Sequence, residues 1–77
     1  MEQKAKELDR ITIDPKILLG KPVIKGTRVP VYILLNLLGE GRSIEEIVKD
    51  YPDVTREDVL AAVRFAAQLT AFEEVEA

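Results

Sequence analysis

Residues 20–31 read Gly-Lys-Pro-Val-Ile-Lys-Gly-Thr-Arg-Val-Pro-Val, a stretch in which short β-branched segments lie between glycines and prolines. Gly26 has no Cβ, so it readily adopts the positive φ that a tight reversal needs, while Val23-Ile24 before it and Val29 after it favour extended backbone. The stretch therefore predicts a hairpin-like ribbon immediately before an apolar helix. It carries three cations, which we expect to point outward: Lys21, Lys25 and Arg28.

Two segments before the ribbon complete the N-terminal part of the chain. Ile11-Thr12-Ile13 alternates apolar and polar residues and is stopped by Asp14-Pro15, so it predicts a short edge strand. Its expected partner is either Val23-Ile24 or Val29. Residues 17–20, Ile-Leu-Leu-Gly, are as consistent with a single helical turn closed by glycine as with a loop.

The first helix is predicted from about Pro30 to Leu38, since proline is tolerated at the start of a helix and glycines follow the apolar pattern. Apolar residues surround most of this helix, which predicts burial on most sides, at the centre of the core or of a dimer. Asn36 is the polar exception. It is either a buried amide that fixes the register of a dimer or a partly exposed residue that bonds to nearby backbone.

Two further helices follow, each introduced by a capping box. The second begins at Ser43 and ends before Pro52, and the third begins at Thr55 and continues to about Leu69 or Phe72. In both, a cap hydroxyl and the acidic side chain three residues later satisfy each other's backbone N–H groups. The connection between them has the length found in helix-turn-helix units.

These elements predict a mainly α fold, a small three-helix helix-turn-helix-like domain with a short N-terminal β-ribbon. We expect residues 1–10 to be a flexible arm and residues 11–77 to be the single domain. A chain of 77 residues hides only roughly 60% of its unfolded surface when it folds alone, so association as a homodimer or with a partner protein is expected.

The third helix is more apolar than one packing face requires. Phe65, Leu69 and Phe72 form a second stripe beside the stripe that faces the core. We interpret these three residues as a dimer or partner interface, with simple core packing as the alternative.

The composition argues against catalysis. The chain has no cysteine and no histidine, which removes disulfides, thiolate nucleophiles, zinc sites and the usual proton shuttle. The acidic pairs lie at helix starts or in the C-terminal segment, where capping and solvated roles are ordinary. We predict that the protein is not an enzyme and that it holds no metal and no cofactor.

Charge is distributed unevenly along the chain. Residues 1–42 hold 8 Lys/Arg against 5 Asp/Glu, and residues 43–77 hold 3 against 9, within a net charge of −3. The acidic total argues against indiscriminate nucleic-acid binding, while the basic half can present a local patch to phosphates. The polar N-terminus and the lack of a long apolar run predict a cytoplasmic protein without a membrane span or signal peptide.

The order of five motifs resembles one known family. The motifs are Ile-Thr-Ile-Asp-Pro, the ribbon, Gly-Arg-Ser-Ile-Glu-Glu-Ile, Asp-Tyr-Pro and Thr-Arg-Glu-Asp-Val, and together they span residues 11 to about 69. They closely resemble domain-of-unknown-function family 433, whose members are predicted VapB-like antitoxins. The resemblance implies a homeodomain-like or winged-helix-like DNA-binding fold, a dimer, and a partner toxin of the PIN-like ribonuclease type.

Two segments are candidates for contact with DNA. In a helix-turn-helix protein the first turn of the third helix would face the bases, and Arg56 is its cation. Residues 55–58 nevertheless carry a net charge of −1, which phosphates repel, and capping is the alternative role of their carboxylates.

The basic ribbon is the better candidate for a phosphate contact. Lys16 and Arg42 are possible additions to its three cations, Lys21, Lys25 and Arg28. The alternative is structural, with Arg28 paired to Asp14 or Glu40 to hold the ribbon on the domain.

The sequence therefore predicts an antitoxin of a type II toxin–antitoxin system that neutralises a PIN-like ribonuclease toxin and leaves binding of its own promoter DNA open. The alternative is a dimeric protein–protein interaction adaptor without nucleic-acid binding, which the acidic total charge favours.

Overall fold

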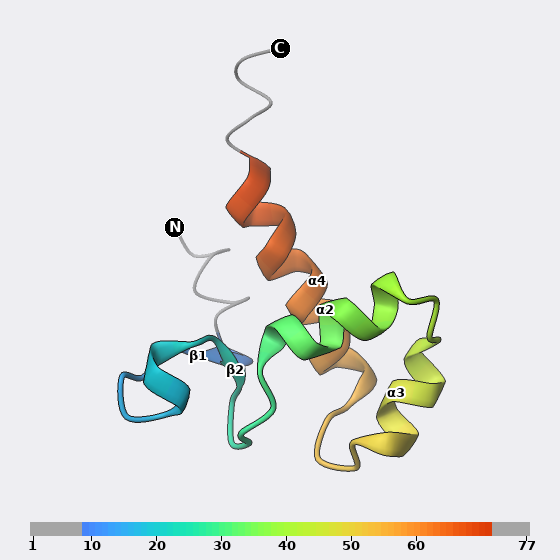
Figure 1. Cartoon of the computed structure of the whole chain (residues 1–77), viewed down its shortest axis with the longest axis horizontal. Coiled ribbons are helices and arrows are strands. Elements are labelled where there is room, and N and C mark those ends of the chain that lie inside the picture. Colours follow the sequence, from blue (N-terminus) through green and yellow to red (C-terminus); the bar gives the residue numbers. More distant parts are fainter. Residues whose placement is uncertain (1–8, 72–77) are drawn as a thin grey trace.

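The computed structural model describes residues 9–71, which form a short two-stranded ribbon and three helices packed on one another (Figure 1). The predicted class, a mainly α three-helix domain with a short N-terminal β-ribbon, is confirmed. Helix α2 crosses α4, and the ribbon and α3 lie at opposite ends of α2 (Figure 1). In chain order the elements are β1 (Ile11–Thr12), the one-turn helix η1 (Leu18–Gly20), β2 (Val23–Ile24), α2 (Val31–Gly39), α3 (Ile44–Asp50) and α4 (Arg56–Thr70).

The first strand pairs with Val23-Ile24, one of its two predicted partners. β1 and β2 are antiparallel, with Ile11 opposite Ile24. Ile13, which was expected to continue the strand, lies outside it and is 56% exposed. The strand ends early because the chain turns at Asp14, whose carboxylate accepts a hydrogen bond from the backbone N–H of Lys16 at 2.9 Å.

The predicted reversal after β2 depends on Gly26 and Thr27. Gly26 has a φ of +81°, and a Cβ placed there would meet nothing within 4 Å, so backbone conformation rather than space requires glycine. The Thr27 hydroxyl donates to the carbonyl of Ile24 at 2.8 Å and accepts from the N–H of Val29 at 3.0 Å. The chain then returns beside β2, where the N–H of Ile24 donates to the carbonyl of Val29 at 3.0 Å.

Helix α2 begins at Val31, because Pro30 is its N-cap, with ψ of 145°. The predicted burial of this helix on most sides is only partial in the single chain. Val31 and Leu34 are buried and Tyr32 is 50% exposed. The residues that pack partly buried against the core are Leu35, Leu37 and Leu38. In the single chain α3 and α4 cover one side of α2, and a domain of this size supplies no second layer for the other. Asn36 is exposed.

Both predicted capping boxes are present. The N–H of Glu46 donates to the Ser43 hydroxyl at 3.1 Å, and the N–H of Ser43 donates to the Glu46 carboxylate at 3.0 Å. The same pair of bonds joins Thr55 and Asp58, at 3.1 and 3.0 Å. These bonds satisfy N–H groups that helix geometry leaves without partners, which explains why α3 and α4 start where the sequence predicts.

Within residues 9–71 no helix has both the length and the hydropathy that crossing a bilayer requires.

The core draws residues from the ribbon and from every α helix. Aromatic side chains contribute only from the edge of the core, where Tyr51 and Phe65 pack partly buried against the cluster. The buried cluster consists of Ile11, Ile24, Val31, Leu34, Ile47, Val54, Val59, Ala61 and Ala62.

The start of the described chain is tied to α4. The Arg10 guanidinium donates to Asp58 Oδ1 at 3.0 Å, and the carbonyl of Arg10 accepts from the N–H of Lys25 at 2.9 Å. Asp58 is 8% exposed and uses its other oxygen, Oδ2, for the capping box. Of the predicted arm, residues 1–10, only Asp9 and Arg10 are among the described residues. Arg10, its last residue, belongs to the folded unit.

Replacing Asp58 with Ala should lower the free energy of unfolding by about 1.5–3 kcal/mol, because the change removes both the carboxylate bond of the α4 capping box and the partner of Arg10. Urea unfolding monitored by far-UV circular dichroism measures the loss. Glu46→Ala, which removes the equivalent but exposed capping carboxylate of α3, is the matched control and should cost less than about 1 kcal/mol. Equal losses for the two variants would show that the Arg10 contact adds nothing.

Candidate functional site

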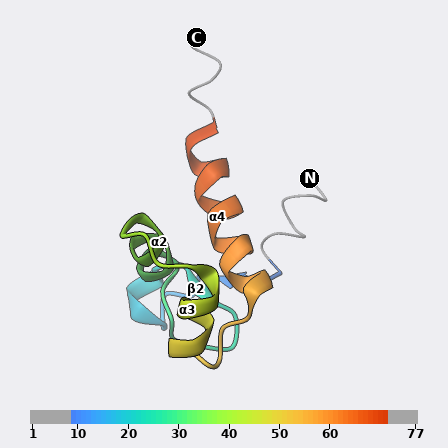
Figure 2. The same ribbon diagram turned by 90° about the vertical axis from the view of Figure 1, so that its right-hand side faces the viewer.

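An open apolar groove lies between α2 and the C-terminal half of α4. Its volume is about 480 Å³. Figures 1 and 2 both show this half of α4 projecting beyond the other helices, so no other helix within residues 9–71 covers its end. The residues that line the groove are Lys21, Pro22, Val31, Tyr32, Leu35, Phe65, Ala66 and Leu69.

The predicted interface residues of α4 divide into three cases. Phe65 lines the groove but is partly buried and packs against the core, so it contributes to both interpretations. Leu69 lines the groove and is 60% exposed. Phe72 lies outside the described residues. Leu69 is therefore the side chain whose replacement tests an interface without disturbing the core.

The chain contains a strained turn immediately before Lys21, the first residue that lines the groove. Leu18 and Leu19 have φ values of 49° and 58°, and Gly20 follows at 86°. Two hydrogen bonds close the turn, from the N–H of Gly20 to the carbonyl of Ile17 at 3.0 Å and from the N–H of Lys21 to the carbonyl of Leu18 at 3.1 Å. Of the two predicted alternatives, a helical turn and a loop, the segment forms the helical turn, but this turn is left-handed. This conformation costs about 1–2 kcal/mol for each non-glycine residue.

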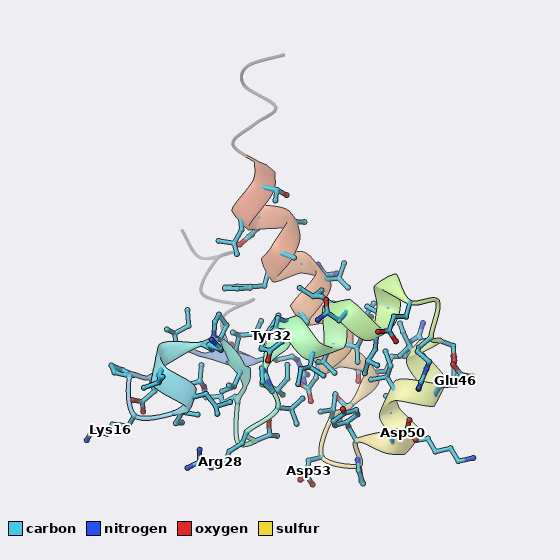
Figure 3. The ribbon with its side chains drawn as sticks, in the orientation of Figure 1. Lys16, Arg28, Tyr32, Glu46, Asp50 and Asp53 are labelled. Carbon is cyan, nitrogen blue, oxygen red and sulfur yellow. The ribbon has the colours of Figure 1, made fainter. Side chains whose placement is uncertain are left out.

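The predicted cations of the ribbon are all on the surface. Lys21, Lys25 and Arg28 are exposed, as is Lys16. Figure 3 shows Lys16 and Arg28 at the ribbon end of the molecule, whereas Glu46, Asp50 and Asp53 lie at the α3 end. Within residues 9–71, Arg28 forms neither of the ion pairs that the structural alternative predicted, with Asp14 or Glu40. The charge asymmetry of the sequence thus becomes a separation in space.

The other two predicted cations lie away from the ribbon, at the acidic end. Arg42 is in the α2–α3 connection, with Nη1 3.3 Å from Asp50 Oδ2. Arg56 begins α4, with Nη1 3.5 Å from Glu45 Oε2, and both side chains of this pair are largely exposed. Surface pairs of this kind contribute little to stability, but they place a carboxylate beside each cation. The structure therefore does not bring Arg42 or Arg56 together with the ribbon cations.

The site has the features of a binding surface. In the part of the chain that the structure describes, no three Asp or Glu side chains lie close enough together to hold a metal ion. All buried side-chain nitrogen and oxygen atoms of the described residues have hydrogen-bond partners. The groove is lined mainly by apolar side chains and includes the cation Lys21 among its described residues.

Comparison with known proteins places this geometry in a family. A family model described as "Protein of unknown function (DUF433)" matches residues 11–66. The chain belongs to this family. The DUF433 match begins with β1, includes the ribbon and α2, and ends within α4 after Ala66, so it contains every lining residue of the groove except Leu69.

One solved structure and two sequence relatives are similar to the chain. A DUF433 member protein from Anabaena variabilis, whose crystal structure is at 2.00 Å resolution, matches with a TM-score of 0.75 and 28% identity, over 97% of this chain and 78% of that one. "Uncharacterized protein y4eO" of Sinorhizobium fredii is 38% identical over 56 residues, which are 73% of this chain and 25% of the relative. An "Uncharacterized protein" of Archaeoglobus fulgidus is 58% identical over 24 residues, 31% of this chain and 67% of the relative. The chain thus spans a quarter of the Sinorhizobium protein.

Sequence reasoning missed the contribution of the ribbon and of α2 to the groove. Tyr32 and Leu35 were assigned to a buried helix, and Lys21-Pro22 to the ribbon alone. The available signal was the apolar character of α2 on nearly every side, which exceeds what a domain of this size can bury. Nothing in the sequence indicated the left-handed turn, apart from Gly20 at its end.

The strain at Leu19 predicts that Leu19→Gly raises the free energy of unfolding by roughly 0.5–1 kcal/mol. Glycine relieves the left-handed conformation, and its extra freedom in the unfolded chain offsets part of that gain. Ile17→Gly is the matched control, since Ile17 has an ordinary φ of −114° and the same change should destabilise the fold. Urea unfolding of both variants gives the comparison. A loss of stability in Leu19→Gly as large as in Ile17→Gly would contradict the strain.

Proposed function

We propose that this DUF433 protein is a non-enzymatic interaction module, an antitoxin that neutralises a PIN-like ribonuclease toxin through the groove between α2 and α4. The observation that carries the proposal is the groove itself, about 480 Å³ in volume and open to solvent, with Leu69 60% and Tyr32 50% exposed at its walls. Contiguous exposed apolar surface of this kind marks interaction sites. The resemblance of the motifs to predicted VapB-like antitoxins supports the choice of partner.

Homodimer formation is part of the proposal. Leu60 and Val63 are 37% and 41% exposed and, by helical geometry, lie on the side of α4 opposite Phe65 and Leu69. The helix therefore offers apolar surface on two sides, one for the groove and one for a second copy. A domain of this size gains a large share of its stability from such coverage.

Promoter DNA is proposed to meet the ribbon rather than the first turn of α4. The ribbon end presents exposed cations, whereas Glu57 and Asp58 at the start of α4 are carboxylates and Arg56 is paired with Glu45. Phosphates are attracted by the cations of the ribbon and repelled by the carboxylates at the start of α4. In a dimer, Lys21, Lys25 and Arg28 of both copies would supply six cations.

A second function, a dimeric adaptor without nucleic-acid binding, is favoured by the capping boxes. The carboxylate of Asp58 is fully used by Thr55 and Arg10, so the helix that would read bases has a structural reason for its acidic start. The groove serves this function as well as the first one. The DNA titration below separates the two.

The proposed neutralisation can be tested with the product of the neighbouring gene, if that gene encodes a PIN-like ribonuclease. The purified chain should abolish the ribonuclease activity at a one-to-one ratio, and sedimentation should give the chain alone twice its monomer mass. Leu69→Ser should weaken inhibition about tenfold or more, since it removes an exposed apolar contact without opening the core. Ile13→Ser, at an equally exposed apolar residue of the ribbon end, is the control and should inhibit normally. Full inhibition by Leu69→Ser would exclude the groove as the surface that binds the ribonuclease.

The proposed DNA contact predicts strong dependence on salt. Six phosphate contacts give a slope of log K against log salt concentration near −5, and Arg28→Ala should reduce its magnitude by about 2 in a dimer. Titration of a promoter fragment at several salt concentrations measures this. Arg56→Ala is the control and should leave the slope unchanged. A larger change in the salt slope for Arg56→Ala than for Arg28→Ala would show that DNA contacts α4 instead. If no DNA binding is measured at low salt, the adaptor function is the one that stands.

A further inference from the structure

Leu19 combines two properties that are unusual together. Its side chain is 93% exposed, and its backbone is held in the left-handed region together with that of Leu18. A single exposed leucine needs no explanation, but strained backbone that persists at a rigid turn points to a function. The Leu19 side chain lies in solvent, where it is available to a partner.

We propose that the turn at 18–20 and the groove form one docking surface, which binds an amphipathic protein segment with carboxylates beside its apolar side chains, and that Leu19 is the anchor of this surface. The proposal rests on the proposed function in that it takes the occupant of the groove to be a protein. It goes further in naming the chemistry of that occupant and the residue that holds it.

The turn leads directly into one wall of the groove, which Lys21-Pro22 form. Leu19 stands two residues before Lys21, so their Cα atoms are at most about 7.6 Å apart. The hydrogen bonds from Gly20 to Ile17 and from Lys21 to Leu18 fix the turn relative to that wall. A partner segment that lies in the groove and extends past Lys21 is therefore within reach of Leu19.

The charges of the surface select the partner. Lys21 is the one charged residue among those that line the groove, and Lys16 is exposed just before the turn. Asp14, whose carboxylate accepts from the N–H of Lys16, adds one negative charge there, so the two lysines still leave this side of the surface positive. A partner segment that carries carboxylates would neutralise these lysines while its apolar side chains fill the groove. The phosphates of DNA would pair with the lysines, but DNA offers no apolar side chains to pack against Tyr32, Leu35 and Leu69.

The probe for this surface is a fluorescent helical peptide with leucines at positions i, i+3, i+4 and i+7 and glutamates around them. A second peptide carries lysines in place of the glutamates. Anisotropy titration with the full chain should show the glutamate peptide binding at least tenfold more tightly. Lys21→Glu should reverse the preference, which a purely structural role of Lys21 would not produce.

The anchor is tested with Leu19→Gly, which retains the left-handed turn. This variant should bind the glutamate peptide about tenfold more weakly while its melting temperature rises, so the loss of binding is not a loss of folding. Ile13→Thr, an exposed apolar residue away from the groove, should bind normally. Equal affinity for the two peptides, no binding of either, or unchanged affinity of Leu19→Gly would each overturn the proposal.

A DNA duplex titrated in parallel covers the other class of partner. If Leu19→Gly weakens binding of the duplex but not of the glutamate peptide, the turn is a nucleic-acid contact and the proposal is wrong. If the peptide results are as expected but the neighbouring ribonuclease is not inhibited, the proposed function fails and the docking surface remains. The two failures are therefore distinguishable.

Discussion

The carboxylate of Asp58 is the interaction on which the rest of this domain depends. One oxygen accepts from the backbone N–H of Thr55 and so starts α4, and the other accepts from the guanidinium of Arg10, 48 residues earlier in the chain. Arg10 in turn accepts a backbone bond from Lys25 and leads directly into β1. A single buried acid thus connects the first strand, the ribbon and the last helix. A buried carboxylate without such partners would be costly, so its bonds favour the arrangement in which the three elements are assembled.

The surfaces that remain after this assembly are unequal in chemistry. Exposed cations lie toward the ribbon end of α2, where Figure 3 shows Lys16 and Arg28, and the acidic residues Glu46, Asp50 and Asp53 lie toward the α3 end. Between them α2 has one side in the core and the other beside an open groove, because three short helices cannot enclose one another. Side chains that a larger protein would bury are therefore available for binding. This is the physical basis for an interaction module in so small a chain.

Local chemistry allowed much of the fold to be predicted. Ser43 and Thr55 were recognised as caps because a hydroxyl and an acid three residues later satisfy backbone groups within one turn. The reversal of the chain at Gly26 was predictable because only glycine takes positive φ without cost. The candidate site was harder to predict. Leu69 and Lys21 were named for separate roles, and only the packing of α4 across α2 brings them to the same groove.

Two of the expectations that did not hold concern relations between distant residues. The burial of α2 was overestimated, since apolar periodicity shows which residues can be buried but not how many neighbours the chain supplies. Arg42 was grouped with the ribbon cations, yet the α2–α3 connection places it beside Asp50. The sequence by itself determined where the helices start, where the ribbon turns and how charge is divided along the chain, because these depend on contacts within a few residues. Only the tertiary structure decided the partner of Asp58, the groove and the place of Lys21 in its lining, because each requires elements that are far apart in the chain to pack side by side.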